Sequence, residues 1–123
     1  MQQNAAQTYQ NVGRQISNPR ELEATLLLQA AARLQSVHDS WDEKRTQLDE
    51  ALLYNRKLWT VFLSEMTDAS NPMPKDVRQN VANIGLFVMN HTVTAMTDPN
   101  PVHLDSLISI NREIAAGLLG RAA

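Results

Sequence analysis

The residues of this chain best suited to chemistry are three histidines and two asparagine–arginine pairs. His38, His91 and His103 lie far apart and share no helix face with acidic residues at the spacing of metal ligands. The chain contains no cysteine, no Gly-rich phosphate loop and no nucleophile elbow. The sequence therefore predicts a protein without catalytic residues, without a metal site and without a cofactor.

The asparagine–arginine pairs occupy the middle of two apolar segments. They are Asn55–Arg56 and Asn111–Arg112, and each is suited to binding an anion or to a structural role. An asparagine inside an apolar core must find hydrogen-bond partners or cost about 1–3 kcal/mol. We therefore favour the structural interpretation and expect a polar core in which Asn55 and Asn111 meet, with Arg56 and Arg112 beside them.

The first of these segments is a long apolar stretch. It runs from Leu48 to Met66 without glycine or proline. Its large side chains recur every three or four residues, which places them on one stripe of an α-helix. The residues of this stripe are Leu48, Leu52, Asn55, Trp59, Phe62 and Met66. We expect this helix to lie in the middle of the domain.

Length and charge limit the classes of protein to consider. A chain of 123 residues is expected to form one domain, and its net charge of −2 argues against a general nucleic-acid binder. No apolar run approaches the roughly 20 residues that span a bilayer. The polar N-terminus lacks the features of a signal peptide. These observations favour a cytoplasmic protein that does not enter the membrane.

Capping residues and prolines divide the chain into helices. The pattern predicts an all-α, single-domain bundle of about five helices over residues 1–123. We expect Asn18, Ser40 and Asn100 to cap helices, Pro74 to begin one, and a break near Asp39. The expected helices span residues 3–16, 19–37, 40–67, 74–96 and 101–119.

The expected helix 74–96 is apolar on two sides. Its β-branched stripe of valines and isoleucine suits a rigid core, whereas the other stripe contains flexible methionines. The second stripe either lines a groove that binds a partner helix or is buried against the second and fifth helices. Its residues are Leu86, Met89, Val93 and Met96, and Tyr9 in the first helix is a further candidate for partner binding.

Four blocks of sequence, in order along the chain, resemble one known family. The blocks are PRELEATLLLQAAARL from Pro19, LDEALLYNRKLWT from Leu48, NPMPKDVRQNVANIGLFV from Asn71 and LISINREIAAGLLG from Leu107. Each block alone is a weak signal, but together their order and spacing resemble the flagellar biosynthesis regulator FlaF of alphaproteobacteria.

The resemblance implies a non-enzymatic protein that is needed for flagellin synthesis, secretion and flagellum assembly. Proteins of this family are regarded as flagellin-directed chaperones or regulators that work alongside the translational regulator FlbT. Flagellin would then be the partner, since its free termini are amphipathic segments that a groove can cover. The alternative is an RNA-binding post-transcriptional regulator of flagellin mRNA, which the acidic charge balance and the few aromatic residues disfavour.

Overall fold

The computed structural model describes residues 18–120, and these residues form α-helices, short 3-10 helices and connecting turns. The long helices are α2 (Pro19–Asp39), α4 (Leu48–Met66), α5 (Lys75–Thr97) and α6 (Leu104–Leu118). The all-α class is confirmed, but this part of the chain has four long helices rather than about five. The expected helix 3–16, with Tyr9, lies outside the described residues.

The capping predictions at Asn18 and Asn100 are confirmed. The Oδ1 atom of Asn18 accepts hydrogen bonds from the backbone amides of Arg20 at 2.9 Å and Glu21 at 3.4 Å. The Oδ1 atom of Asn100 accepts one from the amide of Val102 at 3.0 Å. Each bond satisfies an amide that has no partner in the first turn of its helix, so short-range sequence signals fix these two starts.

The expected helix 40–67 is interrupted, and the expected cap at Ser40 is wrong. A short helix α3 (Trp41–Lys44) is followed by the 3-10 helix η1 (Arg45–Gln47), and only then does α4 begin. Ser40 stands at the N-cap position of α3, but its side chain makes no capping hydrogen bond. Its backbone amide donates to the carbonyl of Ser36 at 3.2 Å, which makes it the C-cap of α2 as well. Ser40 therefore ends α2 near the expected break at Asp39.

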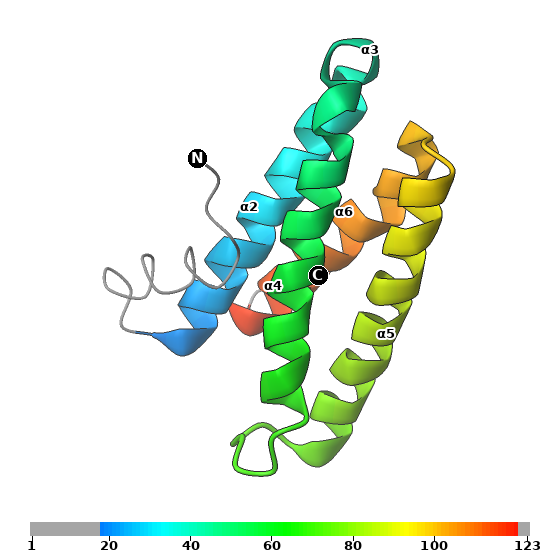
Figure 1. Cartoon of the computed structure of the whole chain (residues 1–123). Helices are drawn as coiled ribbons and strands as arrows, with labels where there is room; N and C mark the ends of the chain where they lie inside the picture. Colours follow the sequence, from blue (N-terminus) through cyan, green and yellow to red (C-terminus); the bar gives the residue numbers. More distant parts are fainter. Residues whose placement is uncertain (1–17, 121–123) are drawn as a thin grey trace.

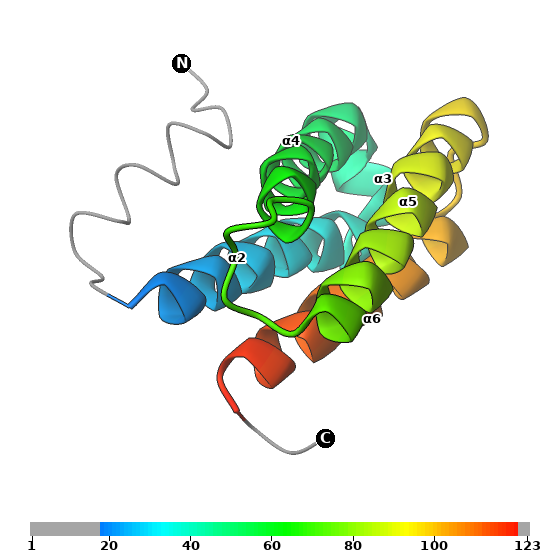
Figure 2. The ribbon, with the colours of Figure 1, turned by 90° about the horizontal axis from the view of Figure 1, so that it is seen from below.

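Helix α2 packs against both α4 and α6, whereas α5 packs mainly against α4. Figures 1 and 2 show α5 on one side of the molecule, joined to α6 by a short connection that contains the 3-10 helix η2 (Pro101–His103). Every residue of the predicted stripe on α4 is buried, with Trp59 and Leu52 fully enclosed. The α2, α4 and α6 helices thus share one core, and α5 covers one flank of it.

None of the helices within residues 18–120 is long and apolar enough to cross a lipid bilayer.

Candidate partner-binding surface

The two asparagines meet in the centre of the core. The Nδ2 atom of Asn111 donates to the Oδ1 atom of Asn55 at 2.7 Å and to the backbone carbonyl of Leu27 at 3.2 Å. The Nε1 atom of Trp59 donates to the Oδ1 atom of Asn111 at 2.9 Å. Both asparagines are fully buried. One amide on α6 therefore links α2, α4 and α6, which makes this cluster a structural element.

The expectation that both arginines join this polar core is wrong. Arg56 and Arg112 are exposed, although each follows a buried asparagine. Successive residues of an α-helix point about 100° apart, so the residue after a seam position leaves the seam. The arginines therefore lie on the solvent side of α4 and α6, away from the asparagine cluster.

Each histidine contacts a carboxylate or carbonyl oxygen. The Nε2 atom of His91 lies 2.9 Å from the carbonyl oxygen of His103, and Nε2 of His103 lies 3.0 Å from a carboxylate oxygen of Asp98. His38 bridges α2 and α6, since its Nε2 atom is 3.0 Å from a carboxylate oxygen of Asp105. Residues 18–120 contain no group of three or more His, Cys, Asp or Glu side chains arranged to hold a metal ion.

The face of α5 that is turned toward α4 is narrow and made of small residues. Its buried residues are Val81, Gly85, Val88, Thr92 and Ala95. A Cβ atom at Gly85 would lie 2.8 Å from the Cγ atom of Leu63 on α4, closer than real Cβ contacts allow. The absence of a side chain at Gly85 therefore lets α5 approach α4 closely.

The predicted partner-binding stripe of α5 is only partly buried. We call Leu86, Met89, Val93 and Met96 the outer stripe. Leu86 is 59% exposed and Val93 is 53% exposed, whereas Met89 and Met96 are half-buried against the core. The alternative, in which the second and fifth helices bury the whole stripe, does not agree with these exposures. The outer stripe instead presents Leu86 and Val93 to solvent, and Met89 and Met96 lie half-buried beside them.

Beyond its first turn, the exposed surface of α5 also lacks charge. The sequence contains no Asp, Glu, Lys or Arg between Arg78 and Asp98, although many residues in this interval are exposed. Surface helices normally carry charged residues on the face opposite the core. Exposed apolar residues with few charges are typical of the centre of a protein–protein interface. This combination makes the outer stripe the leading candidate for partner binding.

A second apolar surface lies on the opposite flank of α5, where α6 diverges from it. This α5–α6 groove has a volume of about 130 Å³ and is lined by Ile84, Phe87, Ile110, Glu113 and Ile114. Phe87 is 46% exposed and its ring stacks on that of His91, with centroids 5.2 Å apart. Sequence reasoning missed this groove, because it assigned Ile84 to a rigid core stripe and did not place Phe87.

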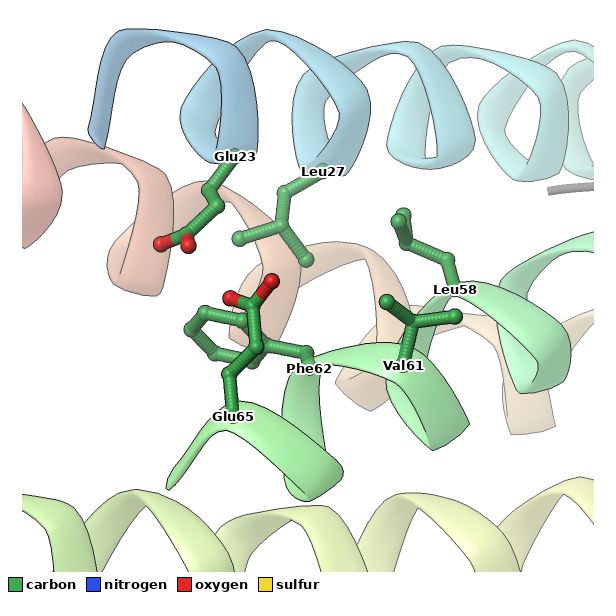
Figure 3. Close-up of a pocket in the computed structure, with 6 residues that line it drawn as sticks. All are labelled: Glu23, Leu27, Leu58, Val61, Phe62 and Glu65. Carbon is green, nitrogen blue, oxygen red and sulfur yellow. The ribbon is translucent and has the colours of Figure 1, made fainter. Parts of the chain in front are cut away.

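Two carboxyl groups share a small hollow between α2 and α4. Figure 3 shows the side chains of Glu23 and Glu65 pointing toward one another beside Leu27 and Phe62. Burial raises the pKa of the Glu23 carboxyl from an ordinary 4.5 to about 8, a hydrogen bond to Glu65 and its charge add to the increase, and Arg20 opposes it. Glu23 therefore holds a proton at neutral pH.

Comparison with known proteins gives one match. The family model described as flagellar protein FlaF matches residues 5–118. Neither the curated proteins nor the solved structures contain a significant match to the chain.

Proposed function

Because the chain belongs to the FlaF family of flagellar proteins, we propose that it acts as a non-enzymatic, flagellin-directed chaperone and regulator. In this proposal, an amphipathic helix of monomeric flagellin binds along the outer stripe of α5. Covering that helix keeps flagellin from aggregating before it is secreted and assembled.

The observation that supports this proposal best is the exposure of Leu86 and Val93 on a helix that has no charged residue after Arg78. The four residues of the outer stripe are spaced three and four residues apart, the spacing at which one helix packs along another. Met89 and Met96 add flexible side chains that adjust to different partner sequences. An uncharged surface also predicts that binding depends weakly on salt.

The proposal is tested by titrating the full-length protein with purified monomeric flagellin and with flagellin lacking either terminus. We expect Leu86→Glu to lower the affinity for flagellin at least tenfold, because a carboxylate would be buried without a partner in the complex. The matched control is Val102→Glu, since Val102 is 58% exposed but lies in η2. Both variants should keep the melting temperature of the wild-type protein.

Wild-type affinity in the Leu86→Glu variant would contradict the proposed surface. The RNA-binding alternative predicts a different result in the same experiment. A regulator of flagellin mRNA acting with FlbT would bind the mRNA leader, and its affinity would fall steeply as salt rises. We expect no such binding, because the chain has a net charge of −2 and too few lysine and arginine residues to neutralise phosphate groups together.

A further inference from the structure

The α5–α6 groove is a second apolar surface of α5, and the proposed function does not use it. Its apolar walls come from two residues of α5 and two of α6, which are Ile84, Phe87, Ile110 and Ile114. The groove has a volume of about 130 Å³. An apolar cavity of roughly 150 Å³ in another protein accommodates a benzene molecule. The groove therefore has room for one further leucine or phenylalanine side chain.

The aromatic wall of the groove is held in one orientation. The ring of Phe87 stacks on that of His91, with centroids 5.2 Å apart. The Nε2 atom of His91 donates to the backbone carbonyl of His103 at 2.9 Å, which ties this stack to η2. Phe87 nevertheless remains exposed. An exposed aromatic side chain that is already oriented loses little conformational entropy when a partner covers it, which favours binding.

The rim of the groove carries one negative charge. Glu113 is the only charged residue among those that line the groove, and it is exposed. Its carboxylate forms no ion pair or hydrogen bond with any residue from 18 to 120. The α5 wall supplies no cation, because no Lys or Arg occurs between Arg78 and Asp98. The charge of the groove is thus complementary to a partner that carries a lysine or arginine beside its apolar residue.

The α6 side of the groove also leaves room for the backbone of a second helix. Gly117 is exposed one turn after Glu113, and a Cβ atom there would meet no neighbouring atom within 4 Å. A glycine inside a helix costs up to about 1 kcal/mol relative to alanine, but it lets another backbone approach closely. Ile110, Glu113 and Gly117 are spaced three and four residues apart, so they form a stripe along which a helix can lie.

We propose that the α5–α6 groove binds an amphipathic helix of another protein, with a leucine or phenylalanine between Phe87 and Ile110 and a lysine or arginine beside Glu113. The backbone of that helix passes close to Gly117. A second copy of the chain is a poorer occupant, because a two-fold contact would bring two Glu113 carboxylates toward each other. The outer stripe lies on the other flank of α5, so a helix in the groove leaves it accessible. This inference concerns a different surface from the flagellin proposal and does not depend on it.

Two designed helical peptides of about 20 residues test the location of the site and the charge of its partner. Both are built from alanine and glutamine with a stripe of leucines, and beside the central leucine one carries a single lysine and the other a single glutamate. We expect the lysine peptide to bind the isotope-labelled full-length protein more tightly, and to shift the amide NMR resonances of Phe87, Ile110 and Ile114. Shifts confined to the surroundings of Leu86 and Val93 would overturn the proposal, since the peptide would then occupy the outer stripe. Absence of binding by both peptides would overturn it as well.

A charge reversal tests whether Glu113 makes the contact. Glu113→Lys should weaken binding of the lysine peptide about fivefold and strengthen binding of the glutamate peptide, because an attraction becomes a repulsion. Glu50→Lys is the matched control, since it changes the net charge equally at an exposed position of α4, and it should leave both affinities unchanged. Equal effects of the two substitutions would overturn the proposal. So would dimers, detected by sedimentation, that Phe87→Glu dissociates, because a second copy of the chain would then occupy the groove.

Discussion

Buried hydrogen bonds cross between helices in the region formed by α2, α4 and α6. In α5, by contrast, the buried hydrogen bond stays within the helix. In the first, the amide of Asn111 bonds to Asn55, Trp59 and the backbone of Leu27, so one side chain joins three helices. In α5, the hydroxyl of buried Thr92 donates to the carbonyl of Val88 in its own helix, at 2.7 Å. The polar group of α5 is therefore independent of its neighbours.

The contrast indicates how each region is held. Hydrogen bonds that cross between helices require one relative placement, so α2, α4 and α6 are fixed in register. Helix α5 is held by apolar contact and by the close approach at Gly85. Part-buried or exposed hydrogen bonds of Arg78 to Met66 and Asp68 and of His91 to His103 add to these contacts. A helix attached through one narrow face keeps its other flanks available, and on α5 these flanks are the outer stripe and the α5–α6 groove.

The largest expected effect is that of Asn111→Leu. It removes all three bonds of the amide and leaves Trp59 Nε1 and Asn55 Oδ1 buried without partners, so we expect a loss of about 3–5 kcal/mol in the free energy of unfolding. Asn55→Leu should cost less, about 1–2 kcal/mol, because the Asn55 side chain makes one bond of this cluster and its Nδ2 atom makes none in the described structure. Urea unfolding of both variants and of the double variant measures these losses. If the double loss equals the sum of the single losses, the cluster does not act as a unit.

The second effect concerns pH and the carboxyl pair in the hollow between α2 and α4. The pKa of Glu23 is raised to about 8 in the folded protein, so the folded state holds a proton that the unfolded state releases near 4.5. The resulting stability is present below pH 4.5 and is lost as the pH rises through about 8. Allowing for the partial exposure of Glu23, we expect a loss of about 1–2 kcal/mol between pH 6 and 9.

Glu23→Gln should remove most of this loss, because a glutamine stays neutral at every pH. Glu113→Gln, at an exposed position of α6, is the control and should keep the wild-type dependence. Thermal unfolding at several pH values gives the comparison. Glu23 would not be the origin of the loss if Glu23→Gln retained the full wild-type dependence on pH.

The third effect tests the close approach of α5 to α4. Gly85→Ala places a methyl group against Leu63, whose side chain must shift, and we expect a loss of about 0.5–2 kcal/mol. Gly117→Ala is the matched control, because a Cβ atom there meets nothing within 4 Å. It should instead gain up to about 1 kcal/mol from helix propensity. Similar gains in both variants, measured by urea unfolding, would mean that Gly85 does not limit the approach.

The smallest effect is expected for Thr92→Val. The substitution keeps the volume of the side chain and removes a hydroxyl that bonds only within α5. We expect a change of less than about 1 kcal/mol in the free energy of unfolding. A loss comparable to that of Asn111→Leu would break the contrast between the two regions, since it would show that α5 also depends on its buried polar group.

Local sequence signals were enough to predict most of the secondary structure. Asn18 with Pro19 and Asn100 with Pro101 determine where helices begin, because capping involves only neighbouring residues. The spacing of apolar residues in α4 also identified its buried stripe correctly. The same signals placed the break at Ser40 but wrongly predicted a side-chain capping bond there and one continuous helix after it.

The sequence by itself determined that Asn55 and Asn111 are buried, and that each requires a polar partner, because both lie within apolar stripes of helical period. Only the tertiary structure decided that Trp59 and the backbone of Leu27 provide the other hydrogen bonds of Asn111. The tertiary structure likewise decided which flanks of α5 are exposed. Helical periodicity assigns residues to faces, but the angle at which α6 crosses its neighbours determines which of those faces is covered.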